Sequence, residues 1–389
     1  MLDVMKEAAL TAIEMTPRPW ETPGELPPKP DFAPCGFVRD ETAEACAPED
    51  LSRIFAEEPF QFLWLPEHPR FLRPEDVPAL REHFRYFALK SARGATTWGM
   101  ILTLGSVGLF LYFRDPNYLF RSLFFVLGGA MLAMGLWQYR QARNFTQDDA
   151  RQMASEARFS IWLESNPLPQ WSYTNALTAV LALVLVAQYA LGGPPTLGLD
   201  AAALDKPLVR QGEWWRLLTA TVMHGGVLHF VFNTMALRDF GRLIETLARG
   251  VFVPLVFLVS AVCGSLFSLV LSPQTSSVGA SGGLLGMLGF LLVASLRRPD
   301  AFPRWFVRNS VQNVVWIALL GVAGFAFIDN AAHLGGLLGG ALMGWLLTDR
   351  NGRDFPLQPT NAVRVAGWIA STLIIATAAW AVWLIRSGG

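Results

Sequence analysis

The chain has 389 residues, of which 52% are hydrophobic and only 16% are charged. This composition is too apolar for an ordinary soluble domain of that length and predicts several helices spanning a lipid bilayer. The 31 basic and 31 acidic residues cancel, so the totals indicate no nucleic-acid partner. The cysteines Cys35, Cys46 and Cys263 have no CxxC spacing and no histidine cluster nearby, which argues against a metal site and a disulfide framework.

Residues 1–94 are expected to form a small cytosolic domain, because acidic residues are concentrated there and apolar blocks dominate afterwards. The first residues lack the basic head and apolar body of a signal peptide, so we expect the amino terminus to stay in the cytoplasm. A proline-rich stretch, 17–34, resembles an extended linker. Helix-start chemistry marks 48–55, a strand or buried turn is expected at 60–65, and a second helix at 75–84.

Two apolar blocks, 96–113 and 119–137, are each near the length that crosses a bilayer, and a short polar link joins them. They predict a transmembrane hairpin over 95–138. The next segment, 139–171, is polar with helix-like spacing, and we expect a cytosolic connector that lies on the membrane surface.

Seven further apolar blocks bring the expected number of spans to nine. They lie at about 174–192, 222–238, 251–271, 279–295, 311–328, 331–347 and 363–385. We therefore expect an all-α polytopic membrane protein whose core is 172–348, followed by a linker and an additional C-terminal transmembrane helix in 349–389.

The positive-inside rule predicts the orientation of these spans. With the amino terminus inside, the arginine-rich loops near 140–151, 242–249, 297–308 and 350–353 are all cytosolic. Agreement is incomplete, because five basic residues fall on the outer side: Arg114, Arg121, Lys206, Arg210 and Arg216. The composition, rich in arginine, alanine and leucine, suggests a bacterial inner membrane.

Strongly polar side chains inside the apolar blocks need a partner or a function. His229 and Asn233 are one helical turn apart and so face the same way, and His224 lies near the outer end of the same block. A second set comprises Ser281, between glycines at the start of one block, and His333, at the start of another. All five residues are expected near the outer face.

Glycines predict how the last two residues could meet. Gly282, Gly286 and Gly289 share a face of the serine helix, and Gly336 and Gly340 share a face with His333, so the two helices can approach closely. Neutral imidazole is a fitting base for a serine hydroxyl near pH 7. The backbone N–H of Ser281 and the side chains of His229 and Asn233 would serve as donors for an oxyanion. With no clear third member, the sequence favours a Ser–His dyad; Asp329 is not assigned a catalytic role.

These motifs resemble the rhomboid intramembrane serine proteases. The resemblance covers about 172–348 and lies in Gly279-Ala280-Ser281-Gly282, in His224-x4-His229-x3-Asn233 and in Ala332-His333-x2-Gly336-x3-Gly340, together with Trp215-Arg216 and Glu245.

The resemblance implies a six-helix core, no cofactor, and cleavage of substrate transmembrane segments near small, helix-breaking residues. It implies Ser281 as nucleophile, His333 as general base, and His229, Asn233 and the Ser281 amide as the oxyanion site. Further residues would be structural: His224, Trp215, Arg216, Glu245, Asn330, Gly279, Gly282, Gly336 and Gly340. The chain departs from the family at Leu285, where many members have an aromatic residue that stacks on the catalytic histidine, and in the hairpin and seventh span that decorate the core.

Three other hypotheses remain. The polar groups could only hold helices together by hydrogen bonds. A catalytically silent rhomboid-like scaffold would bind membrane helices without cleaving them, although the intact Ser281 and His333 argue against it. A transporter would have broken helices near mid-bilayer and inverted repeats, and neither pattern is visible. The substrate, its cleavage site, the role of 1–94 and the oligomeric state do not follow from the sequence.

Overall fold

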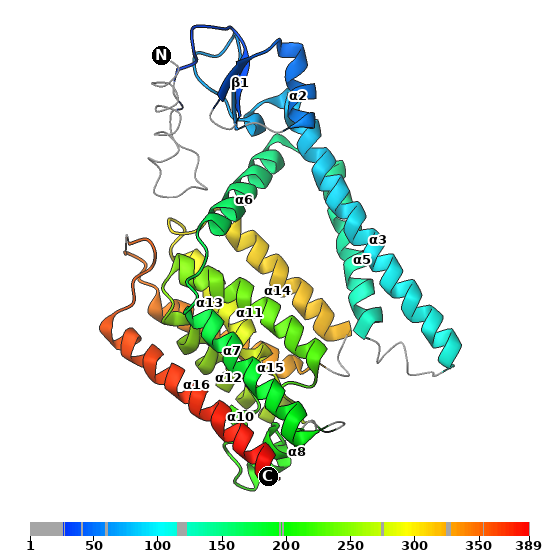
Figure 1. The fold of residues 1–389 in the computed structure, drawn as a ribbon, viewed down its shortest axis with the longest axis vertical. Coiled ribbons are helices and arrows are strands. Elements are labelled where there is room, and N and C mark those ends of the chain that lie inside the picture. The colour runs from blue at the N-terminus through cyan, green and yellow to red at the C-terminus, as the bar shows by residue number, and fades with distance from the viewer. Residues whose placement is uncertain are drawn as a thin grey trace. The chain divides into compact units, whose positions relative to one another are not determined.

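A computed structural model describes residues 26, 28–39, 42–58, 61–114, 123–193, 196, 198–273, 276–323, 328–352 and 354–388. The chain divides into two compact units, Met1–Asn166 and Pro167–Gly389 (Figure 1). Most of the predicted proline-rich linker, most of the hairpin turn and residues 274–275 of an outer loop lie outside the described residues.

The first unit begins with a small domain built on a three-stranded antiparallel sheet. Strand β1 (Gly36–Arg39) lies between β2 (Thr42–Ala45) and β3 (Phe62–Trp64). Alternate residues of β3 face opposite sides of the sheet, so Leu63 joins one apolar cluster while Trp64 joins another, and both are fully buried. The expected strand at 60–65 is therefore present. The all-α description holds for the apolar helices but is wrong for this small domain.

The predicted helix start at 48–55 is also present, as a 3₁₀ turn at Pro48–Asp50 that leads into α2 (Leu51–Glu57). The second helix begins later than expected. Two short 3₁₀ turns, Pro74–Asp76 (η2) and Pro78–Leu80, come first, and α3 (Arg81–Phe113) follows. Proline fixes φ and lacks an N–H, which suits it to the first turn of a helix and not to its interior.

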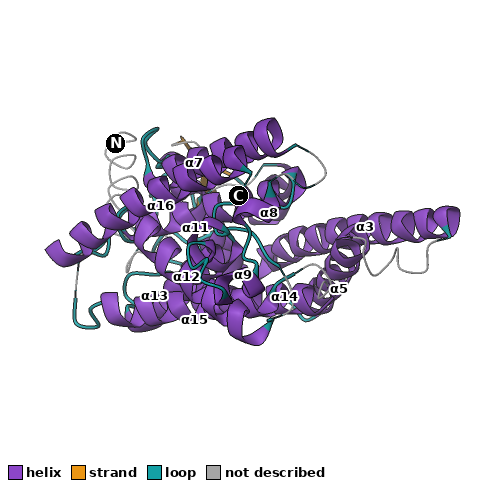
Figure 2. Ribbon diagram, turned by 90° about the horizontal axis from the view of Figure 1, so that it is seen from below, coloured by secondary structure: helices purple, strands orange, loops and turns teal. Residues whose placement is uncertain are grey.

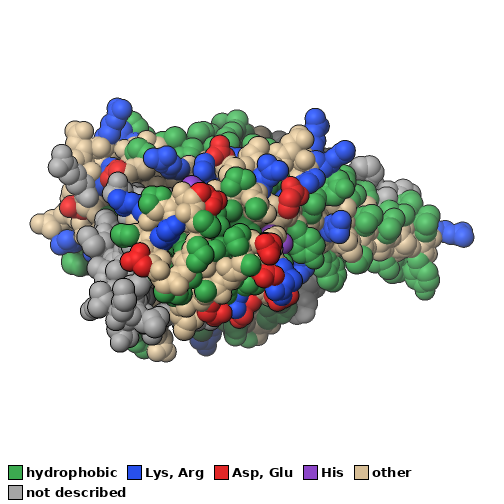
Figure 3. Space-filling model, turned by 90° about the horizontal axis from the view of Figure 1, so that it is seen from above, with side chains coloured by type: hydrophobic (Ala, Val, Ile, Leu, Met, Phe, Trp, Pro, Cys, Tyr) green, Lys and Arg blue, Asp and Glu red, His purple; other side chains and the backbone are tan. Residues whose placement is uncertain are grey.

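Helix α3 continues without a break through the expected domain boundary at 94/95 and packs along α5 (Leu123–Arg143). Small residues allow this close approach: a Cβ on Gly99 would lie 2.4 Å from the backbone N of Leu132, and a Cβ on Gly128 would lie 2.6 Å from that of Thr103. Many hydrophobic side chains lie on the surface of this helix pair (Figure 3).

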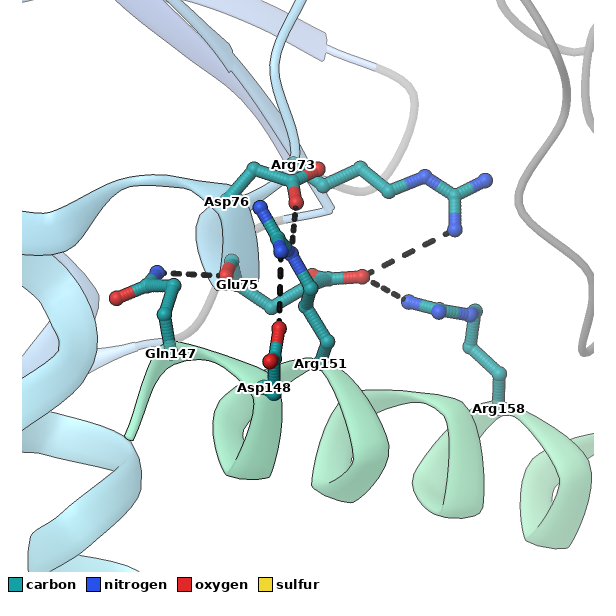
Figure 4. Close-up of polar contacts among 7 residues, drawn as sticks. All are labelled: Arg73, Glu75, Asp76, Gln147, Asp148, Arg151 and Arg158. Carbon is teal, nitrogen blue, oxygen red and sulfur yellow. Dashed lines mark hydrogen bonds and ion pairs between the residues drawn. The ribbon is translucent and has the colours of Figure 1, made fainter. Parts of the chain in front are cut away.

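Helix α6 (Gln147–Ser165) occupies the expected polar connector and begins with a capping box at Thr146. Charged side chains join it to η2 (Figure 4). The buried Glu75 carboxylate lies 2.5 Å from Arg158 Nη1 and 3.9 Å from Arg73 Nη1, and Arg151 Nε donates to Asp76 Oδ1 at 2.8 Å. Burial, and then the neighbouring Arg158 charge, lower the pKa of Arg73. This cluster fixes α6 to the small domain.

The second unit is a bundle of helices. Its elements are α7 (Tyr173–Ala187), continued by a π-helical turn at Gln188–Gly192, the short α8 (Leu199–Ala202), α9 (Lys206–Arg210) and α10 (Arg216–Thr219), and then α11 (Val227–Leu247), α12 (Phe252–Leu271), α13 (Ser281–Arg297), α14 (Phe306–Ala323), α15 (Asn330–Leu347) and α16 (Asn361–Ser387).

The seven spans expected after residue 172 thus correspond to seven longer helices. The largest shifts are at α11, which begins at Val227 and not at 222, and at α14, which begins at Phe306 and not at 311. Residues 324–327 of the span expected at 311–328 lie outside the described residues. Gly226 precedes α11 at φ 136°, a left-handed conformation that suits glycine and ends the preceding turn.

Across the described residues, four helices are long and apolar enough to cross a membrane, namely those ending at Phe113, Gly192, Leu271 and Ser387, and α13 and α14 are shorter apolar helices. In the second unit, α13 is central: every residue from Gly282 to Leu291 is buried, mainly against α12 and α15. These three helices lie together in Figure 2. The protein is an integral multi-pass membrane protein.

Candidate active site

Ser281 and His333 meet at the ends of two neighbouring helices. Ser281 is the first residue of α13, and His333 lies in the first turn of α15. The distance between His333 Nε2 and Ser281 Oγ is 2.9 Å. For Nε2 to accept the hydroxyl proton, the neutral ring must carry its own proton on Nδ1. The geometry is that of a nucleophile hydrogen-bonded to a base.

The glycine faces of α13 and α15 make this contact possible. A Cβ on Gly336 would lie 2.0 Å from the backbone O of Gly282, and a Cβ on Gly340 would lie 1.8 Å from that of Gly286. Real Cβ atoms do not approach an oxygen so closely, so at this helix separation neither position accepts a larger residue. The structure confirms the close approach of α13 and α15 that the glycine spacing predicted.

Two further polar side chains lie beside the chain that leads into Ser281. A Cβ on Gly279, whose φ is 130°, would lie 2.7 Å from His229 Cε1 and 3.6 Å from Asn233 Nδ2. The His229 Nδ1 accepts the Gly225 N–H at 3.4 Å, which leaves Nε2 as the protonated donor in a neutral ring. The buried Asn233 Nδ2 has no acceptor within the described structure. Two donors therefore lie beside Gly279, two residues before Ser281.

His224 supports this group and makes no polar contact with Ser281. Its ring is fully buried and packs edge-on against His229, with ring centres 5.5 Å apart. Its backbone is held by Gln188, whose Oε1 accepts the His224 N–H at 3.0 Å and whose Nε2 donates to the His224 carbonyl at 2.8 Å. Gln188 was not predicted from the sequence, although a strongly polar glutamine within an apolar block meets the same criterion as the histidines.

Trp215 and Arg216 organise the loop between α7 and α11. The Arg216 guanidinium donates to Glu213 Oε2 at 2.6 Å, to the Ala203 carbonyl at 2.9 Å and to that of Asp200 at 3.1 Å. The Trp215 ring stacks on Trp380 of α16, with ring centres 5.9 Å apart. The seventh helix thus contacts this loop, which the sequence did not indicate.

Glu245 and Asn330 each join two helices. The Glu245 Oε1 accepts the backbone N–H of Thr174 at 2.7 Å and so satisfies a free donor at the start of α7. Asn330 Nδ2 donates to the Gly321 carbonyl at 2.9 Å and ties the start of α15 to α14. Leu285, one turn after Ser281, is buried within α13.

Comparisons with known proteins find a matching family model and several similar chains. The family model of the Rhomboid domain matches residues 211–350. Rhomboid protease GluP of Bacillus subtilis is 40% identical over 142 residues, which are 36% of this chain and 27% of that one. RHOMBOID-like protein 7 of Arabidopsis thaliana is 34% identical over 160 residues, 39% of this chain and 51% of that one.

Putative rhomboid protease YdcA of Bacillus subtilis is 30% identical over 148 residues, 38% of this chain and 74% of that one. The matches to GluP and RHOMBOID-like protein 7 cover about half or less of those relatives, so the chain shares the domain that holds Ser281 and His333 and not their full length. With a matching domain model and a relative, YdcA, that the match covers to 74%, the chain belongs to the rhomboid family.

Proposed function

We propose that this protein is an intramembrane serine endopeptidase that cleaves transmembrane segments of membrane proteins with a Ser281–His333 dyad. The observation that carries the proposal is the 2.9 Å contact between Ser281 Oγ and His333 Nε2 at the start of two closely packed helices. A serine is a weak nucleophile until a neighbouring base takes its proton, and this contact supplies the base.

The proposed reaction is an acyl transfer in two steps. Ser281 Oγ attacks the scissile carbonyl carbon while its proton moves to His333 Nε2. The negative charge that forms on the carbonyl oxygen is stabilised by the Ser281 N–H at the helix amino terminus and by the Asn233 and His229 donors. His333 then gives its proton to the leaving amine, and a water, deprotonated by the same ring, releases the acyl group from Ser281.

The proposed topology places this chemistry near the outer face of the membrane. The amino terminus and residues 1–94 would be cytosolic, α3 and α5 would form the additional hairpin over 95–138, and 139–171 would connect it to the core, 172–348. The mostly apolar, exposed surface of the α3–α5 pair supports the hairpin. The loops 193–221 and 272–278, with α14, would control access of substrate and water. We assign a bacterial inner membrane, on composition alone.

The test is covalent labelling of the purified protein in detergent by a fluorescent fluorophosphonate. We expect wild type to be labelled, and Ser281→Ala and His333→Ala to lose the label. The chain offers a matched control, because Ser52 Oγ and His83 Nε2 form another serine–histidine hydrogen bond, 2.7 Å long, in the small domain. Ser52→Ala should label like wild type.

Loss of labelling in Ser52→Ala, or equal labelling of wild type and Ser281→Ala, would contradict the proposal. In the second case a catalytically silent scaffold that binds membrane helices would become the better reading. If Ser281 is labelled as expected, cleavage of a reconstituted single-span substrate, followed by mass spectrometry of the products, would test the endopeptidase step itself.

A further inference from the structure

Lys206, the first residue of α9 in the loop between α7 and α11, is fully buried. Its Nζ lies 3.7 Å from Asp329 Oδ2 and donates to Ser277 Oγ at 3.2 Å. Ser268 of α12 donates to the same Asp329 oxygen. A buried ammonium is costly unless it is paired and hydrogen-bonded, and this cluster provides both partners. Burial lowers the pKa of Lys206, and the Asp329 carboxylate opposes that shift.

Each partner of Lys206 lies the same number of residues before one member of the dyad. Ser277 lies four residues before Ser281, and Asp329 lies four residues before His333. One ammonium group therefore bridges the segment that leads into the serine and the segment that leads into the histidine.

Each of these segments is also attached to the backbone around it. The Ser277 N–H and carbonyl pair with those of Leu204 at 3.3 and 2.9 Å, and the Gly279 N–H donates to the Ala220 carbonyl at 2.9 Å. The outer loop that carries Lys206 thereby holds residues 277–279 in place directly before Ser281.

Asp329 fixes the first turn of α15. Its Oδ1 accepts the Ala332 N–H at 2.9 Å, which makes it the helix N-cap, and its carbonyl accepts the His333 N–H at 3.1 Å. Any movement of Asp329 is passed to the backbone of His333 through these two bonds. The glycine contacts set the separation of α13 and α15, and Gly264 and Gly282 pack near the Ala332 carbonyl of this first turn. Asp329 adds the hydrogen bonds that cap the turn.

We propose that Lys206 and Asp329 are positioning residues, which hold Ser281 Oγ and His333 Nε2 at reacting distance by clamping the two segments that precede them. This inference rests on the proposed function of the dyad and extends it to two residues that do not touch the substrate. The clamp fixes the positions of the two side chains. Its loss should slow the reaction of each Ser281 without lowering the fraction of protein molecules that react.

The experiment compares Lys206→Met, Asp329→Asn and the double variant with wild type. Each single change leaves one buried charge without its partner, while the double change removes both, and asparagine is still able to cap the helix. Arg210→Met is the matched control, because Arg210 is a cation on the same helix that donates to the Leu269 carbonyl and not to α15. Fluorophosphonate labelling gives two readouts, the rate per site and the fraction of sites labelled at completion.

We expect each single variant to label at least about tenfold more slowly at an unchanged final fraction, because a small misplacement of a reacting group costs one to two orders of magnitude in rate. The double variant should be about as slow as the slower single variant, since removing either partner already opens the clamp and coupled partners are not additive. Wild-type rates in the single variants, a reduced fraction with an unchanged rate, or a double variant that recovers the wild-type rate would overturn the proposal.

Hydrogen exchange separates this proposal from the function it rests on. Lys206→Met should speed exchange in both 276–281 and 328–334, whereas Arg210→Met should leave both segments unchanged. If wild type is not labelled at all, the proposed function fails. Faster exchange in both segments would then still support the clamp, and unchanged exchange would refute it.

Discussion

Gly336→Ala tests whether the close approach of α13 and α15 is what assembles the site. The added Cβ would lie 2.0 Å from the Gly282 carbonyl oxygen, and ordinary contact begins near 3.4 Å. The two helices would therefore have to separate by about 1.4 Å, the difference between these distances, since both atoms involved belong to rigid elements. Ser281 Oγ and His333 Nε2, now 2.9 Å apart, would move beyond hydrogen-bond reach.

The expected loss can be estimated from that displacement. A misplacement of about 1 Å costs roughly 10²-fold in rate, so we expect labelling by the fluorophosphonate to fall by at least about 10²-fold. Overpacking of this kind typically destabilises a protein by about 1–3 kcal/mol, which would lower the unfolding temperature in detergent by a measurable amount without unfolding the protein at room temperature.

The control for Gly336→Ala is another helical glycine with free space around it. A Cβ on Gly129 of α5 would meet no atom within 4 Å, so Gly129→Ala should label like wild type and, through better helix propensity, unfold at the same or a slightly higher temperature. If Gly336→Ala kept the wild-type labelling rate, glycine contacts would not be what holds Ser281 and His333 together.

Three further substitutions test other parts of the structure. Asn233→Ala should lower the rate constant for substrate cleavage by about 10²–10³-fold with little change in KM, because an oxyanion donor acts mainly in the transition state; an equal rise in KM would argue against that role. Trp380→Ala removes the stack on Trp215 and should lower the unfolding temperature and slow cleavage, while Trp383→Ala, at a more exposed position of the same helix, should do neither. Arg158→Met leaves the buried carboxylate of Figure 4 short of a partner and should destabilise the small domain by about 3–5 kcal/mol, seen as faster proteolysis of α6 with unchanged labelling of Ser281.

Several features of the site could be predicted because they depend on spacing within one segment. His229 and Asn233 are one turn apart wherever they lie on a helix, and the glycines around Ser281 and His333 form faces in the same way. Helices at the apolar blocks were also predictable, since a bilayer demands long apolar helices. The expected helix after residue 222 began late because Gly226 takes a left-handed conformation, which the apolar pattern does not record.

The sheet of the small domain was harder to predict than the helices, because its strands are short. The strands of the sheet are three or four residues long and are stabilised by partners elsewhere in the chain, as in the pairing of Phe37 with Leu63. A run that short is consistent with a strand or with a buried turn, and only the pairing decides between them.

What the sequence determined by itself is therefore most of the apolar helices and the chemical groups that each one carries. Only the tertiary structure decided which groups meet across large sequence separations: Gln188 with the His224 backbone, Trp215 with Trp380, and Lys206 with Ser277 and Asp329. Spacing within one segment determines which side chains point the same way from a helix. These contacts instead depend on how separate helices and loops pack, which shape and burial over the whole unit determine. The lysine shows this most clearly, because in the sequence it is one basic residue in an outer loop and in the structure it is a buried ion that bridges the two halves of the site.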